Sequence, residues 1–235
     1  MIFIYSGEVP ALDRRLRYEL GATHRLLTIP YAPEEHWAAI EARDYFNSCD
    51  INAHALSKQA YGDKQKLRDE IFTSDAIYLS GGNTYQFLAY AREIGLFSML
   101  QTFESLGGII VTESAGSIIL SSDISTAAIP TTSPDENNVG ITEFDAMGRL
   151  PFHVSPHFEP DEILAMNEMV ELQQLANLSE TPVLVLQDGA GVVVQDGDII
   201  FSVGSPAWVT AADDQRLPSE MATGTAASDN QSLAG

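Results

Sequence analysis

Ser114 is the residue whose surroundings in the sequence best suit covalent chemistry. An apolar run at residues 108–111 predicts a buried strand, and a helical pattern follows the serine directly. A serine on such a turn is exposed at the end of the strand, as in a nucleophile elbow, and the amide of Ala115 then points to where an oxyanion would form. An ordinary helix N-cap is the alternative, and Thr112 stands where the G-x-S-x-G motif has its first glycine.

Two glycines, Gly81 and Gly82, follow the apolar run at residues 76–79 in the same way. Ligands of open α/β sheets bind at the carboxyl ends of strands, and consecutive glycines let backbone amides approach a substrate closely. The alternative is a plain turn in which Asn83 or Thr84 caps the next helix. Taken by itself, this motif favours the plain turn.

His153 and His157 are the candidates for the base that a serine nucleophile needs. Their spacing would suit a metal pair on a helix, but Pro156 lies between them and breaks a helix, so we expect no metal site. We expect one of the two to be the base and the other to be a packed or surface histidine. The remaining histidines lie in early elements without a partner motif and are interpreted as structural: His24, His36 and His54.

The first half of the chain alternates short apolar runs with helical patterns. Strands are predicted at residues 2–5, 25–29, 51–56, 76–79 and 108–111, and helices at residues 34–46, 64–72 and 85–94. This alternation predicts an α/β fold with a mostly parallel sheet and helices on both faces. Right-handed crossovers make such a sheet doubly wound.

The second half is less regular. Residues 125–140 predict a long loop, of a length that is often functional in a compact domain, and residues 161–178 predict the longest helix. Further strands are predicted at residues 182–186, 191–194 and 199–203, the last two joined by a tight turn. We expect one domain over residues 1–214 and a disordered C-terminal tail over residues 215–235, which has no aromatic residue and many small ones.

The composition excludes some classes of partner. The formal net charge is −21, and such a surface repels phosphate backbones, so we expect no nucleic-acid partner. The acidity fits a well-solvated surface, or adaptation to high salt because only three of the twelve basic residues are lysines. No apolar run suits a membrane span, and the lone Cys49 fits a reducing compartment, so we expect a cytoplasmic protein.

Three motifs, in this order and spacing, resemble the peptidase E family of serine peptidases, which includes the cyanophycinases: Gly81-Gly-Asn-Thr84, Glu113-Ser-Ala-Gly-Ser117 and Pro156-His157-Phe158. Residues 139–148 also resemble the stretch before the family's catalytic histidine, and the likeness runs from about residue 2 to residue 208. It implies a sheet like that of class I glutamine amidotransferases, of flavodoxin-like type. It also implies that Ser114 is the nucleophile, that His157 is the base and that Gly82 and Ala115 supply oxyanion amides, with Gly81 and Asn83 at the substrate.

The acid of the triad is expected after the histidine, in a turn at the end of a strand. Asp188 follows the predicted strand at residues 182–186 and could orient His157, although an Asp-Gly turn is also common there. Asp135 is a second candidate. Glu113 differs from what peptidase E has beside its nucleophile, and no arginine is clearly placed to hold an aspartyl side chain, which leaves dipeptidase activity on Asp-X substrates open.

The function predicted from these residues is hydrolysis of an amide bond in a small peptide through an acyl-enzyme, with no metal or cofactor, by a monomer or homodimer. One alternative is an esterase, whose order of triad residues would make Asp135 or Asp145 the acid. Another is a binding protein that has kept the fold and lost turnover because Thr112 or Glu113 disturbs the elbow. A glutamine amidotransferase is disfavoured because serine stands at the elbow and Cys49 lies in an unrelated segment.

Overall fold

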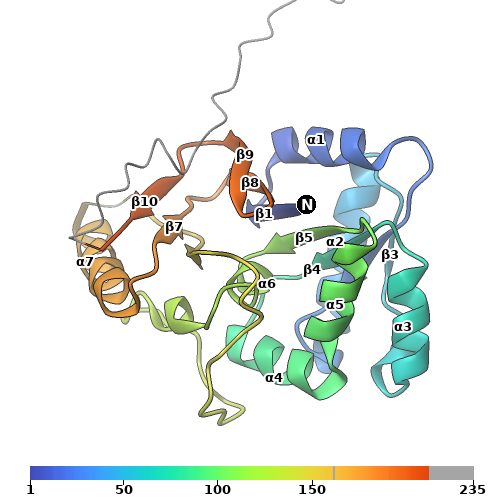
Figure 1. Cartoon of the computed structure of the whole chain (residues 1–235), viewed down its shortest axis with the longest axis horizontal. Coiled ribbons are helices and arrows are strands. Elements are labelled where there is room, and N and C mark those ends of the chain that lie inside the picture. The colour runs from blue at the N-terminus through green and yellow to red at the C-terminus, as the bar shows by residue number, and fades with distance from the viewer. Residues whose placement is uncertain (161, 212–235) are drawn as a thin grey trace, which may run out of the picture.

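The computed structural model describes residues 1–160 and 162–211, and the predicted tail at residues 215–235 lies outside them. Its larger sheet has the strand order β3-β2-β4-β5-β1-β8-β9 (Figure 1). The pairs from β3 to β1 are parallel, whereas β8 is antiparallel to β1 and β9 to β8. The bounds are β1 Ile2–Ser6, β2 Leu26–Ile29, β3 Ala53–Ala55, β4 Ala76–Leu79, β5 Ile109–Glu113, β8 Ala190–Gln195 and β9 Asp198–Val203. The predicted α/β fold with a mostly parallel sheet is confirmed.

Helices cover both faces of this sheet, as the alternation of side chains along its strands requires (Figure 1). Phe3 and Tyr5 of β1 belong to the core that α1 and α2 share, whereas Ile2 and Ile4 belong to the core of α3, α4 and α5. The α-helices are α1 Pro10–Leu20, α2 His36–Ser48, α3 Lys64–Phe72, α4 Thr84–Ile94, α5 Leu96–Ser105, α6 Ala115–Ile118 and α7 Glu162–Ser179. Short 3₁₀ helices are η1 Pro33–Glu35, η2 Lys58–Tyr61 and η3 Ser125–Ala128. Helices α1 and α5 were not predicted from the sequence.

A second sheet of three strands, in the order β10-β7-β6, lies beside the larger one (Figure 1). Val154 and Leu184 belong to the same core as the larger sheet, whereas Val183 and Val185 pack against α7. The strands are β6 His153–Ser155, β7 Val183–Val185 and β10 Ala207–Val209. Of these, only β7 was predicted. The predicted loop at residues 125–140 holds η3 and otherwise has no helix or strand.

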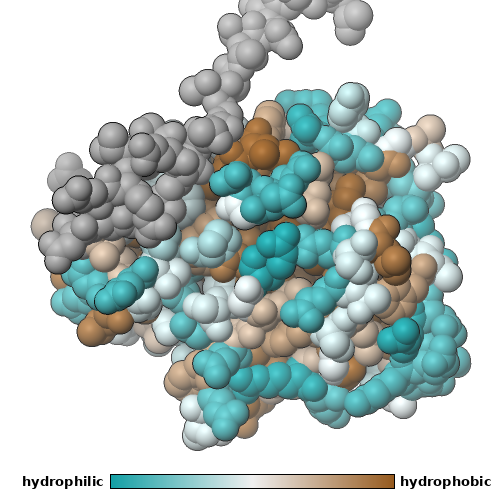
Figure 2. All heavy atoms as spheres, in the orientation of Figure 1, coloured by the Kyte–Doolittle hydropathy of each residue, from teal (hydrophilic) through white to brown (hydrophobic). Residues whose placement is uncertain are grey.

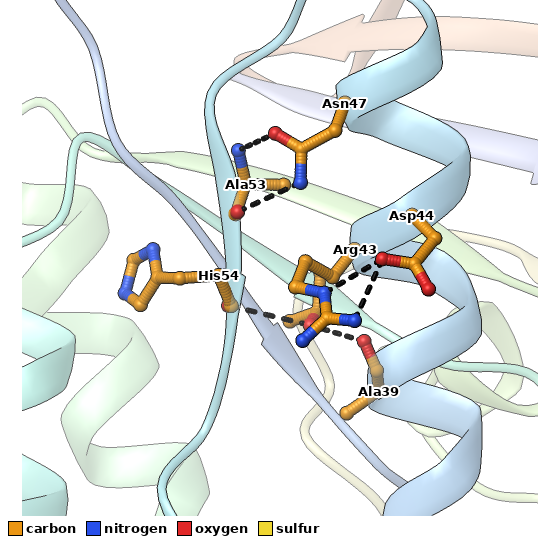
Figure 3. Close-up of polar contacts among 7 residues, drawn as sticks. Ala39, Arg43, Asp44, Asn47, Ala53 and His54 are labelled. Atoms are coloured by element: carbon orange, nitrogen blue, oxygen red, sulfur yellow. Dashed lines mark hydrogen bonds and ion pairs between the residues drawn. The ribbon is translucent and has the colours of Figure 1, made fainter.

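Helix α2 is fixed to the edge strand β3 by polar contacts (Figure 3). The Asn47 side chain donates to the carbonyl of Ala53 and accepts from its N–H, both at 3.1 Å, so it satisfies backbone groups that an edge strand would leave unpaired. The hydroxyl of Thr28 on β2 donates to the carbonyl of Ala39 at 2.7 Å. These contacts hold α2 against the sheet, and side chains of this helix form one wall of the site described below.

The surface in Figure 2 is mixed, with hydrophilic residues covering the region over α3 at the right of the view. Helix α3 itself is mostly polar and buries only Leu67 and Ile71. Among the described residues, no helix combines the length and the apolar character that a membrane span requires.

Candidate active site

Ser114 lies between β5 and α6 with backbone angles φ 49° and ψ −117°, a region that residues with a side chain rarely adopt. Its N–H donates to the carbonyl of Tyr5 at 3.4 Å, and its carbonyl accepts from Ser117 and Ile118. Helix α6 passes so close to β4 that a Cβ on Gly116 would lie 2.4 Å from the Leu79 carbonyl oxygen. The surrounding backbone therefore holds the strained turn and turns the serine out of the sheet.

Thr112 stands where the G-x-S-x-G motif has its first glycine, and its side chain is accommodated inside the fold. Its side chain is fully buried, and its hydroxyl donates to the carbonyl of Phe3 at 3.1 Å. The same hydroxyl lies 2.8 Å from that of Ser117 on α6, which is also fully buried. Thr112 thus connects the strand before the nucleophile to the helix after it. These contacts stabilise the turn at Ser114, whereas the binding-protein alternative supposed that Thr112 would disturb it.

The glycine pair lies against the elbow. A Cβ on Gly81 would lie 3.3 Å from the Cβ of Ser114, and Gly82 has φ 134° with the Tyr31 ring so close that a Cβ would lie 2.1 Å from it. Only glycine fits at Gly82, where both the backbone angle and the space exclude a side chain. Asn83 is the N-cap of α4: its side chain accepts from the N–H of Gln86 at 2.9 Å, and it lines neither cavity described below.

His157 follows β6 and has a positive φ of 58°. Its Nδ1 lies 2.5 Å from Oδ1 of Asp188, and its own N–H donates to the hydroxyl of Ser6 at 2.9 Å. Asp188 precedes β8, whose first residue, Ala190, is paired with Ser6 because β8 runs antiparallel to β1. The reversal of strand direction therefore brings Asp188 to the same sheet edge as the nucleophile.

Ser6 is a residue of this site that the sequence reasoning missed. It is fully buried at the end of β1, and its hydroxyl lies 3.4 Å both from the Leu186 carbonyl and from Oδ1 of Asp188. Its carbonyl accepts from Gly189 at 2.7 Å. Ser6 thus links the larger sheet to the segments that carry the histidine and the aspartate. No motif in the sequence indicates this role, because a serine at the end of a strand is common.

The other candidates for the acid and the base have different partners. Asp135 accepts from the backbone N–H of Thr84 at 2.8 Å and forms no hydrogen bond with His157. His153 is fully buried in β6, its Nε2 3.9 Å from Asp123, and burial lowers its pKa. It is therefore the packed member of the histidine pair. Among the described residues, no cluster of three or more His, Cys, Asp or Glu side chains could hold a metal ion.

Two cavities meet at Ser114 and His157, and both residues line each of them. The first cavity, of about 420 Å³, lies between α2 and the ends of β1, β4 and β5, and it includes Gly81 and Gly82. The second cavity, of about 380 Å³, lies between the start of α4, the loop after α6 and the segment after β6, and it includes Asp135 and Glu168. A bond positioned at Ser114 would have one cavity on each side.

Glu113 lines the first cavity beside the nucleophile and accepts a hydrogen bond from the hydroxyl of Tyr78. Burial, followed by the charge and hydrogen bond of Glu113, raises the pKa of Tyr78 well above its ordinary value. The phenol therefore keeps its proton and acts as a donor only toward the carboxylate. This hydrogen bond fixes the position of the Glu113 side chain in the cavity wall.

The sequence of this chain is similar to those of peptidases. The family model described as Peptidase family S51 matches residues 4–202. The protein named Peptidase E from Shewanella denitrificans is 29% identical over 212 residues, which cover 85% of this chain and 84% of that protein.

Two solved structures share the fold. A protein from Listeria monocytogenes EGD-e assigned as a peptidase E has a TM-score of 0.69 at 20% identity, covering 86% of this chain and 96% of its own. A peptidase from an acI-B1 Actinobacterium has a TM-score of 0.61 at 16% identity, covering 90% and 94%. At these identities the two structures show likeness of fold.

Proposed function

The chain belongs to peptidase family S51, which makes it a serine-type peptidase, and we propose that it hydrolyses an amide bond of a small peptide through a Ser114-His157-Asp188 triad. The family expected from the three sequence motifs is thus confirmed. The observation that carries the triad is the 2.5 Å contact between His157 and Asp188, with His157 sharing both cavities with Ser114.

In the proposed acylation step, the Ser114 Oγ attacks the carbonyl carbon of the substrate while Nε2 of His157 takes the hydroxyl proton. Asp188 accepts the hydrogen bond of the Nδ1–H, which keeps Nε2 free to act as the base. The amides of Gly82 and Ala115 are the proposed donors to the oxyanion, since Ala115 is the first residue of α6 and its N–H has no acceptor within that helix.

Collapse of the tetrahedral intermediate breaks the C–N bond, and His157 passes the proton to the leaving amine. A water molecule then attacks the acyl-enzyme with His157 again as base, so the products are a carboxylic acid, an amine and the free serine. The two cavities support this course because they provide separate room for the acyl group and for the leaving group.

The proposal is tested by labelling with a fluorophosphonate probe and mapping the adduct by mass spectrometry. We expect labelling at Ser114 that is lost in Ser114→Ala and strongly slowed in His157→Ala. Ser122→Ala is the matched control because Ser122 is exposed and lines neither cavity. A folded protein that does not react at Ser114, or His157→Ala labelling at the rate of the unaltered chain, would overturn the mechanism.

A further inference from the structure

The first cavity is distinguished by an aromatic wall combined with carboxylates. Three carboxylates line it, from Glu8, Glu41 and Glu113, and no lysine or arginine is among the described residues around it. The aromatic residues that line it are Tyr5, Tyr31, Trp37, Tyr45, Phe46 and Tyr78. A substrate carboxylate in this cavity would be repelled by the three carboxylates, whereas a cation would be attracted by them and could contact the aromatic rings.

Two of the three carboxylates that line the first cavity have no partner among the described residues. Within the part of the chain that the structure describes, the Glu8 and Glu41 side chains are exposed and form no hydrogen bond or ion pair. The second cavity differs, because Asp135 accepts from the N–H of Thr84 and Glu168 from the hydroxyl of Ser155 at 3.2 Å. Two of the three acidic residues that line the second cavity thus already have partners within the protein, and the third, Glu159, is exposed.

Glu113 is the carboxylate best placed to select a ligand. It is adjacent to Ser114 in the chain, it is half-buried, and Tyr78 holds it by a hydrogen bond. A partly desolvated and oriented carboxylate binds a cation more strongly than an exposed one, because water screens the interaction less. Glu8 and Glu41 add negative potential at the exposed side of the same cavity.

We propose that the first cavity binds a cationic substrate side chain, that of arginine or lysine, and that Glu113 is the residue that determines this specificity. The inference rests on the proposed peptidase reaction and names its substrate class. A preference for aspartyl substrates would require a basic residue in this cavity. The proposal accounts for the lack of lysine and arginine among the described residues that line it.

The test compares dipeptides that differ only in side-chain charge: arginyl-alanine against citrullyl-alanine, and lysyl-alanine against norleucyl-alanine. Each pair has the same α-ammonium group, so a difference in rate reports the side chain alone. The reverse orders, with alanine first, are assayed as well, so that the basic residue can enter from either side of the scissile bond. We expect kcat/KM to favour the charged member by about 10- to 100-fold in one of the two orders.

Glu113→Gln keeps the size of the side chain and its contact with Tyr78, and we expect it to reduce this preference at least about tenfold. Glu93→Gln is the control, since Glu93 is exposed on α4 and lines neither cavity, and it should leave the preference unchanged. Equal rates within each pair, or an unchanged preference in Glu113→Gln, would overturn the inference while leaving the peptidase mechanism intact.

A binding measurement separates the inference from turnover. In Ser114→Ala, which cannot form the acyl-enzyme, isothermal titration should show tighter binding of the charged peptide, and Glu113→Gln in that background should remove the difference. If the native chain hydrolyses no peptide in a Ser114-dependent way, the proposed reaction fails, and the titration still decides what the cavity binds. Equal affinities for the charged and neutral peptides would refute the cationic site.

Discussion

Replacing Thr112 by glycine would complete the G-x-S-x-G motif, yet we expect it to damage the protein. The hydroxyl of Thr112 is hydrogen-bonded to the Ser117 hydroxyl at 2.8 Å, and both side chains are fully buried. Its loss leaves a buried hydroxyl unpaired, at a cost of about 1–3 kcal/mol. The lost methyl leaves a small void worth about 1 kcal/mol, and glycine inside a strand adds about 0.5–1 kcal/mol.

Together these effects predict that Thr112→Gly lowers the free energy of unfolding by about 2.5–5 kcal/mol. Thr112→Ser keeps the hydroxyl and loses only the methyl group, so it should cost about 1 kcal/mol. Thr112→Val keeps the shape and loses the hydroxyl, so it should cost about 1–3 kcal/mol. Urea unfolding followed by far-ultraviolet circular dichroism measures all three on the same scale.

The rate of peptide hydrolysis should fall in the same order as the stability, because the hydrogen bond between Thr112 and Ser117 joins the two elements that hold the nucleophile. Thr112→Ser should retain most of kcat/KM, and Thr112→Gly should lose most of it at a temperature where the protein is still folded. The reasoning is refuted if Thr112→Gly is as stable as Thr112→Ser, or if completing the motif increases the rate.

Three further predictions concern the base, the elbow and acid stability. In steady-state assays, Asp188→Asn should lower kcat/KM about 10- to 1,000-fold and Asp135→Asn less than about threefold. The reason is that, of the two aspartates, Asp188 contacts the base, and equal losses would contradict its role. Gly116→Ala places a Cβ 2.4 Å from the Leu79 carbonyl oxygen at the end of β4, so the free energy of unfolding should fall by about 1–3 kcal/mol. An unchanged midpoint of urea unfolding would contradict this close packing. Burial, and then the charge of Arg25, lowers the pKa of His54 from 6.5 to about 4. The unfolded chain therefore takes up this proton first, so stability should fall as the pH drops from about 6.5 to about 4, and urea midpoints of His54→Gln should depend less on pH in that window.

The parallel half of the sheet could be predicted because its strands are buried on both faces and so read as continuous apolar runs. The strand at residues 76–79 and the helix at residues 64–72 agree with β4 and α3 to the residue. Helix α1 was missed because it buries few apolar side chains, chiefly Leu12 and Leu16. The arginines and other polar residues between them in the sequence hide the helical period. The strands β6 and β10 were missed because each has three residues and, unlike the equally short β7, neither lies in an apolar run of four residues such as that at residues 183–186.

The candidate site was predictable where a residue lies at the end of a predicted strand. Ser114, Gly81 and Gly82 could be grouped because parallel strands end at one edge. Asp188 also follows a predicted strand, at residues 182–186, but the rule for parallel strands does not place it at this edge, because it reaches the edge through the antiparallel strand β8. The sequence likewise could not separate Asn83 as a helix cap from Asn83 as a substrate contact, because its neighbours in the chain are the same in both cases.

The link at Ser6 has a consequence for thermal inactivation. The nucleophile is carried by the larger sheet, whereas the base follows β6 of the smaller one, so their separation depends on how the two sheets are joined. Loosening of the three-stranded sheet would misplace the base while leaving the seven-stranded sheet folded. The temperature at which activity is lost should therefore lie below the melting temperature of the whole chain, and the gap between the two should widen when the Ser6 hydroxyl is removed.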